Sequence, residues 1–232
     1  MLEALGPDLW TAQDILRLPA GVRLPLRMTA IRLPKGGLVV HSPLPLTDDL
    51  LKAVARIDAV EYLIAPSNLH HRFAGQWLQR FAGAKLYGSV GLPKKRKDLA
   101  FAGQLAASGD DGAPAPWALV LDQQLVAGAP KLNEVAFFHK STGTLLVSDL
   151  LFNVTRPANV MTGLVLSMAG TKGRLAMSRA WRGYTKDKRA LKASLEKILA
   201  WPFTRILPGH GEVFEDPAAV EKARAAMVWA LG

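Results

Sequence analysis

Four side chains that can bind a metal ion stand at the ends of apolar segments. His70 and His71 lie in the loop Pro66–Arg72, Asp149 follows the apolar or small residues Leu145–Ser148, and His210 sits between two glycines. Imidazole nitrogens and carboxylate oxygens bind zinc, iron and manganese. Because the chain has no cysteine, any metal site must be built from His, Asp, Glu or Asn.

The two adjacent histidines cannot both enter one site if their segment is extended. Successive side chains then point to opposite sides, so only His70 or His71 could be a ligand. In that interpretation Asn68 is a further oxygen donor. The alternative is structural: one ring packs against the sheet edge and the other faces solvent.

Asp149 and His210 each allow two interpretations. A carboxylate at the end of a buried strand is costly unless it is paired or metal-bound, so Asp149 is expected to contact either Arg72 or a single metal ion. The glycines beside His210 let the backbone approach a site closely. Its imidazole either binds the metal or forms a hydrogen bond with Asp149 or a backbone carbonyl. His139, in a turn beside Lys140, is expected to be exposed.

The first half of the chain predicts β-α-β units. Such units favour parallel neighbouring strands, with functional loops at the carboxyl ends of the strands. The strands are expected at Leu9–Thr11, Met28–Leu33, Leu38–Val40, Val60–Ala65 and Lys85–Tyr87, and the helices at Thr47–Ile57 and Phe73–Phe81.

The second half predicts an antiparallel meander followed by helices. The strands are expected at Ala118–Leu121, Gln124–Ala127, Glu134–Phe138 and Thr144–Val147; a helix at Asp187–Ala200, a strand at Thr204–Ile206 and a last helix from Asp216-Pro217 follow. The turn-rich stretch Ala106–Pro116 is interpreted as a surface loop within one domain. Two groups of strands with helices indicate an α/β or α+β fold with sheet packed on sheet.

Three fragments in order resemble the metallo-β-lactamase superfamily: Pro66–Arg72, Gly143–Leu150 and Leu207–Gly211. The Asn68–His71 loop and Gly91–Arg96 are similar to an uncharacterised bacterial branch, a domain family of unknown function. The resemblance implies a four-layer αββα sandwich, with residues 1–232 as a single domain. It also implies that any active site lies at one edge between the two sheets.

The first loop departs from the superfamily pattern His-x-His-x-Asp-His. Ser67 and Leu69 stand where the first two histidines are expected, His71 falls on the Asp position and Arg72 on the last His. An arginine there would supply the positive charge of a lost metal ion.

Two other positions match the superfamily and one does not. Asp149 and His210 occupy the expected places, whereas Ala127–Pro130 replaces a Gly-His turn. Two matched ligands do not make a two-metal hydrolase. The resemblance therefore implies a degenerate site with one Zn, Fe or Mn ion at most, or with none.

The formal net charge of +10 predicts attraction to anions. Much of it lies in Lys94–Lys97 and Lys172–Lys192, which could equally be solvated surfaces. An anionic small molecule is the expected partner. Nucleic acid has little support, because only Trp181 and Tyr184 interrupt the basic clusters with aromatic rings. No membrane partner is expected and the protein is placed in the cytoplasm, since no apolar run could span a bilayer and Met1–Leu18 is not a signal peptide.

Two functions therefore remain open. The first is a metal-dependent hydrolase that uses His70 or His71 with Asp149 and His210 and acts on an anionic substrate. The second is a non-catalytic binding protein on the same fold, in which Arg72 and the histidines form a positively charged pocket for an anionic ligand. The metal content separates them; the sequence does not indicate the substrate or the oligomeric state.

Overall fold

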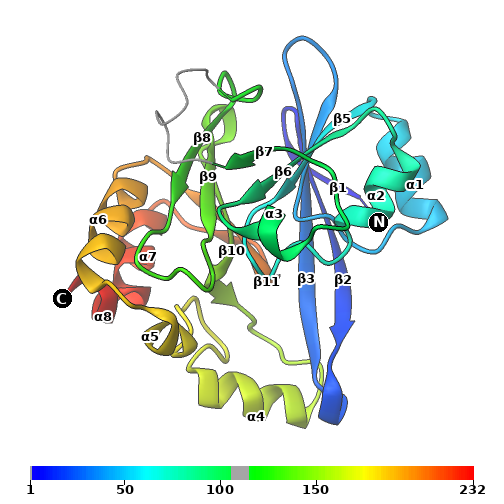
Figure 1. Cartoon of the computed structure of the whole chain (residues 1–232). Helices are drawn as coiled ribbons and strands as arrows, with labels where there is room; N and C mark the ends of the chain where they lie inside the picture. The colour runs from blue at the N-terminus through cyan, green and yellow to red at the C-terminus, as the bar shows by residue number, and fades with distance from the viewer. Residues whose placement is uncertain (1, 106–114) are drawn as a thin grey trace.

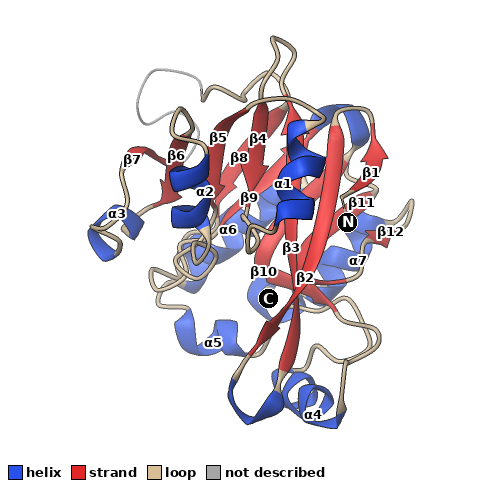
Figure 2. Cartoon of the chain, turned by 90° about the vertical axis from the view of Figure 1, so that its right-hand side faces the viewer, coloured by secondary structure: helices blue, strands red, loops and turns tan. Residues whose placement is uncertain are grey.

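The computed structural model describes residues 2–105 and 115–232, so most of the loop predicted at Ala106–Pro116 lies outside the described residues. Two β-sheets face each other, and helices cover the outer face of each (Figures 1 and 2). This is the four-layer αββα arrangement that the resemblance to the metallo-β-lactamase superfamily implied. None of the described helices is both long and apolar enough to cross a bilayer.

The first sheet has seven strands in chain order. They are β1 (Glu3–Gly6), β2 (Leu9–Arg17), β3 (Arg23–Arg32), β4 (Leu38–His41), β5 (Val60–Ala65), β6 (Lys85–Ser89) and β7 (Phe101–Leu105). Pairing is antiparallel from β1 to β4 and parallel from β4 to β7. The parallel connections carry α1 (Asp48–Ala55), α2 (Ala74–Arg80) and α3 (Leu92–Lys95), as parallel pairing requires a crossover.

The second sheet has the order β12 (Phe214–Glu215), β11 (Arg205–Gly211), β10 (Thr144–Asn153), β9 (Val135–His139) and β8 (Leu121–Leu125). Only the β10–β11 pair is parallel. Between and after these strands lie α4 (Val160–Ala169), α5 (Ala180–Tyr184), α6 (Lys188–Leu199), α7 (Ala219–Ala226) and α8 (Val228–Leu231).

Three hydrophobic clusters hold the four layers together. Ile64 and Phe137 belong to the cluster between the sheets, Trp77 to the one under α1 and α2, and Leu195 to the one under α6 to α8. Both faces of each sheet are therefore buried, which explains the nearly continuous apolar runs of the central strands.

The long β2–β3 hairpin extends beyond the first sheet and reaches α4 (Figures 1 and 2). Asn159 donates a hydrogen bond to the carbonyl of Gly21, and the hydroxyl of Thr162 accepts one from the backbone N–H of Arg23. The sequence did not predict this hairpin extension. Its leucines line a cavity at the site described below instead of the core between the sheets.

Several predicted elements differ in their bounds. The strands β2, β3, β10 and β11 are longer than predicted, and the two strands predicted at Ala118–Leu121 and Gln124–Ala127 form the single strand β8. Ala118–Val120 forms a turn, and the strand there begins at Leu121. The predicted last helix is divided into α7 and α8, and α7 begins at Ala219. The carboxylate of Asp216 accepts a hydrogen bond from the backbone N–H of Ala218, so it stabilises the preceding turn.

Gly128 makes a close backbone contact that holds the start of α6. It has φ +82°, and its carbonyl accepts hydrogen bonds from the N–H groups of Lys186 and Asp187. A Cβ at this position would lie 2.1 Å from the Asp187 carbonyl oxygen. We expect Gly128→Ala to lower the free energy of unfolding by about 3 kcal/mol, through this clash and the unfavourable φ.

Gly173→Ala is the matched control, because Gly173 has φ +76° and its Cβ would meet no atom within 4 Å. It should cost about 1 kcal/mol, from the backbone conformation alone. Urea denaturation of both variants measures the difference. Equal losses would show that the contact with Asp187 does not determine the effect.

Candidate metal centre

Three of the predicted site residues meet where the two sheets face each other. His70 comes from the loop after β5, Asp149 from β10 and His210 from β11. One ligand atom of each lies within 4.8 Å of the other two. The His210 Nε2 atom is 3.2 Å from Asp149 Oδ1 and 3.3 Å from His70 Nε2, which lies 3.5 Å from Asp149 Oδ2.

Hydrogen bonds on the far side of each imidazole fix the direction of its Nε2 atom. His210 Nδ1 lies 2.7 Å from the carbonyl oxygen of Pro25. A carbonyl only accepts, so Nδ1 must carry the proton, and Nε2 is the ring atom that faces Asp149 and His70. His70 Nδ1 lies 2.8 Å from the Ser42 hydroxyl. Metal-binding histidines typically have such outer partners.

A buried glutamate holds the backbone at Asp149. Glu134 is fully buried, and its two carboxylate oxygens accept hydrogen bonds from the N–H groups of Ser148 (2.7 Å) and Asp149 (2.9 Å). The β10–β11 register shifts between Val147 and Phe152, so this backbone lies outside the regular ladder. The sequence interpretation did not assign Glu134 to the site. The one available signal was a carboxylate at the start of an otherwise apolar strand.

A buried arginine holds the backbone on both sides of His210. Arg27 on β3 donates to the carbonyl of Pro208 (3.0 Å), to that of Gly211 (2.6 Å) and to the hydroxyl of Thr11 (2.9 Å). Burial lowers the pKa of Arg27 to about 10, against the opposing effect of nearby glutamates. The sequence interpretation also missed Arg27, because it began this strand at Met28, one residue after Arg27, whereas β3 begins at Arg23.

The electrostatics of the cluster centre on the Asp149 carboxylate. Burial would raise the pKa of Asp149, but His70 and His210 hold it well below its usual range. Burial would lower the pKa of His70, yet the charge and hydrogen bond of Asp149 raise it above its ordinary value. Burial and the charge of Asp149 raise the pKa of Glu134 to about 7. Burial, with a contribution from His70, lowers the pKa of His41 to about 3. The cluster therefore favours one positive charge beside Asp149.

The other predicted candidates lie outside this group of three. His71 Nδ1 is 2.8 Å from a guanidinium nitrogen of Arg96, and burial together with Lys95 and Arg96 lowers the pKa of His71 to about 4. The amide of Asn68 faces the carbonyls of Pro130 and Lys131, each at 3.4 Å.

Arg72 and His139 also differ from the expected contacts. Across residues 2–105 and 115–232, Arg72 makes no ion pair with Asp149; its guanidinium lies 5.9 Å from the ring centre of Phe73. The expectation that His139 is exposed was wrong. His139 is buried, with its Nδ1 atom 2.7 Å from the hydroxyl of Thr142.

A cavity of about 340 Å³ opens onto the three ligands. Its walls include four leucines of the β2–β3 hairpin, namely Leu16, Leu18, Leu24 and Leu26. His70, Asp149 and His210 line it together, and Arg72 is the one Lys or Arg side chain among its described lining residues. A volume of this size suits a small organic ligand.

Solved structures, several of them metallo-β-lactamases, match nearly the whole chain. A metallo-β-lactamase from Pontibacter korlensis has a TM-score of 0.66 at 12% identity, covering 98% of each chain. The mono-zinc form of FIM-1 from Pseudomonas aeruginosa has a TM-score of 0.66 at 10% identity, covering 100% of this chain and 96% of its own. The metal-soaked Flv1 flavodiiron core from Synechocystis sp. PCC6803 has a TM-score of 0.67 at 12% identity, covering 99% of this chain and 60% of its own.

Residues 7–170 match a family described as a domain of unknown function, DUF4336. The chain belongs to this family. No curated protein matches its sequence. The segment that matches DUF4336 contains His70 and Asp149, whereas His210 lies beyond it. This DUF4336 protein therefore completes its group of three with a residue outside the matched segment.

Glu134→Gln tests the support of Asp149. The amide offers one oxygen to the two N–H groups and turns its NH2 toward the other, which leaves a buried donor unsatisfied. We expect the free energy of unfolding to fall by about 1–3 kcal/mol. Glu215→Gln is the control, because Glu215 forms an exposed pair with Arg205 and should cost about 0–1 kcal/mol. Chemical denaturation measures both, and an equal effect would rule out a special role for Glu134.

Proposed function

We propose that this protein is a metal-dependent hydrolase that holds a single divalent ion through His70, Asp149 and His210. One observation carries the proposal. The outer nitrogen of each imidazole is occupied by an oxygen of Pro25 or Ser42, so both Nε2 atoms face the Asp149 carboxylate. Two histidines and one carboxylate with an open fourth position are the donor set of a catalytic zinc site.

The residues present fit one ion. Asp149 Oδ2 is buried, and its contact with His70 Nε2 is long, at 3.5 Å, so a cation between the two atoms would satisfy both. Ser67 Oγ accepts hydrogen bonds from the N–H groups of Leu69 and His70, and the Leu69 side chain is half exposed. Neither position supplies a ligand for a second ion. Within the described residues, no other group of three His, Asp or Glu side chains lies close enough to hold a metal.

A bound divalent ion would lower the pKa of a water ligand to about 7 and so supply a nucleophile for hydrolysis. The chain's own residues would position the reacting centre and form the walls around it. His70, Asp149 and His210 fix the position of the reacting centre through their outer hydrogen bonds. The hairpin leucines give the cavity an apolar wall, beside which electrostatic interactions are stronger than in water.

The cavity favours a substrate with an apolar body and one anionic group. The leucine walls would contact the apolar body, and Arg72 would attract the anionic group. This group is expected at the Arg72 side, because Arg72 is the one Lys or Arg side chain among the described lining residues. The alternative function is a non-catalytic protein that binds such an anion without a metal ion.

A zinc titration tests the metal site. We expect protein freed of metal by a chelator to bind one equivalent of Zn²⁺, measured by competition with a chromogenic chelator. His210→Ala and Asp149→Asn should each weaken binding at least 100-fold, since each removes one of three ligands. His71→Ala is the matched control and should leave zinc affinity unchanged, because His71 contacts Arg96 instead.

Two bound equivalents of zinc would contradict the mononuclear site. An equal loss in His71→Ala would contradict the ligand assignment. Absence of zinc binding, together with metal-independent binding of an anionic ligand, would favour the non-catalytic alternative.

Hydrolysis of chromogenic esters tests the activity and the role of Arg72. Protein loaded with Zn²⁺, Fe²⁺ or Mn²⁺ is compared on a neutral ester and on one that carries a carboxylate. We expect His210→Ala to lower kcat/KM at least 100-fold on both esters. Arg72→Ala should raise KM about tenfold on the anionic ester only, because it removes the cation of the cavity. Arg80→Ala, an exposed arginine of α2 outside the cavity, serves as the control. Equal effects of Arg72→Ala on both esters would contradict the proposed contact.

A further inference from the structure

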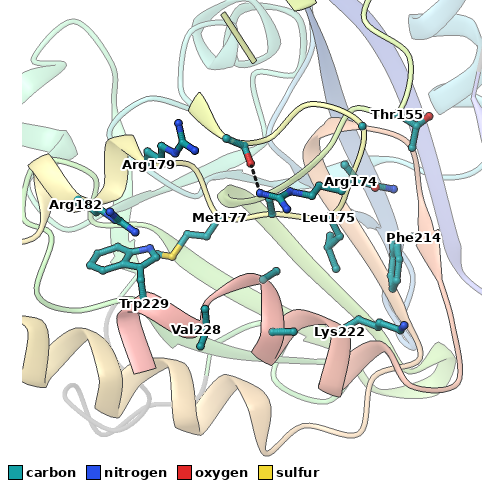
Figure 3. Close-up of a pocket in the computed structure, with 16 residues that line it drawn as sticks. Thr155, Arg174, Leu175, Met177, Arg179, Arg182, Phe214, Lys222, Val228 and Trp229 are labelled. Atoms are coloured by element: carbon teal, nitrogen blue, oxygen red, sulfur yellow. Dashed lines mark hydrogen bonds between the residues drawn. The ribbon is translucent and has the colours of Figure 1, made fainter. Parts of the chain in front are cut away.

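A second and larger cavity, of about 760 Å³, lies between the segment that joins α4 to α5 and the C-terminal helices α7 and α8 (Figure 3). It shares no lining residue with the cavity of the metal centre. Its size is within the range of sites that bind small organic molecules.

Positive charge gathers in this cavity without a matching negative charge. Arg174, Arg179, Arg182 and Lys222 line it, and no Asp or Glu is among its described lining residues. None of these four cations forms an ion pair within residues 2–105 and 115–232. Elsewhere in the same part of the chain, Arg and Lys side chains do pair with carboxylates, as at Arg32, Arg96, Lys140, Arg205 and Arg224. The four cations are therefore available to an external anion.

The backbone and an indole ring hold the arginines in place. Arg174 donates a hydrogen bond to the carbonyl of Gly170 (3.4 Å) and Arg179 donates one to that of Met168 (3.3 Å). A side chain at Gly170 would press on Arg179, because its Cβ would lie 3.0 Å from Arg179 Nε. The Arg182 guanidinium lies 5.4 Å from the ring centre of Trp229. Each contact uses only part of a guanidinium and leaves other N–H groups free.

The rest of the wall is largely apolar. Figure 3 shows Trp229 and Val228 on the helical side and Phe214 at one end, with Arg174 across from the helices. The Val228 side chain is 67% exposed and so is available to a ligand. Such a wall suits the body of an organic ligand, and the arginines suit its charged groups.

We propose that this cavity binds a small organic ligand that carries at least two phosphate groups. Arginine forms paired hydrogen bonds with phosphate oxygens, and each terminal phosphate brings close to two negative charges. Two linked phosphate groups, one of them terminal, offset most of the charge of the four unpaired cations. The apolar body of the ligand contacts Trp229 and Val228. A cavity with a single, half-buried indole favours this ligand over a nucleic-acid strand, which needs a continuous basic groove with several stacking rings.

Calorimetric titration of the metal-free protein with ADP, pyrophosphate and inorganic phosphate tests the proposal. We expect ADP to bind more tightly than pyrophosphate, and both to bind at least tenfold more tightly than inorganic phosphate. Arg174→Ala and Arg179→Ala should each weaken ADP binding at least tenfold. Arg189→Ala is the control, because it removes the same charge from an exposed position of α6 outside the cavity.

The metal centre and simple surface attraction need separate tests. His210→Ala should keep full ADP affinity, whereas a loss would place the ligand at the metal centre and overturn the proposal. An equal loss in Arg189→Ala would show non-specific attraction by net charge. If a 20-mer oligonucleotide displaces ADP at a concentration lower than that of pyrophosphate, the cavity belongs to a nucleic-acid surface instead. If ADP does not bind at millimolar concentration, the proposal is overturned. Thermal unfolding verifies that each variant is folded, and charge-retaining Arg179→Lys should lose less affinity than Arg179→Ala.

Discussion

The ionised carboxylate of Asp149, buried between two imidazoles, is the constraint on which the site depends. An unpaired carboxylate in a low-dielectric interior is strongly unfavourable, so a positive charge must lie beside it. No Lys or Arg in the described residues pairs with Asp149; its partners are His70 and His210. Fully buried Glu134 adds a second acid nearby. The histidines must therefore share a proton with the carboxylate or share a metal ion with it.

This constraint is met across the interface between the sheets. Arg27 on β3 of the first sheet binds the carbonyls on both sides of His210 on β11 of the second. Pro25, also on β3, accepts the hydrogen bond of the His210 ring. The packing of the two sheets therefore determines the position of His210. Glu134 positions Asp149 within the second sheet in the same manner, by holding two backbone N–H groups.

The sequence could identify the residues that end apolar runs, but it could not show in which direction each side chain points. Asp149 and His210 were recognisable because each follows a run of apolar residues at a place that the metallo-β-lactamase resemblance also marks. The choice between His70 and His71 depends on loop geometry: the Ser67 hydroxyl caps the turn through the N–H of His70. Arg27 and Glu134 escaped prediction because buried charges on strands are rare, and only tertiary contacts give them partners. The layers were predictable from apolar periodicity with the resemblance, whereas the hairpin leucines line the cavity of the site, a role that no periodic pattern indicates.

The space between the three ligand atoms decides whether an arginine side chain or a smaller cation can supply the positive charge that Asp149 requires. An arginine in place of a metal would need room for a planar guanidinium among three ligand atoms that lie within 4.8 Å of one another. Arg72, the residue at the former ligand position, instead lies over the ring of Phe73. Only a proton or a single metal ion fits that space. The net charge of +10 therefore does not neutralise the buried carboxylate. Part of it lies in the unpaired cations of the second cavity, where an anion can approach without competing with Asp149.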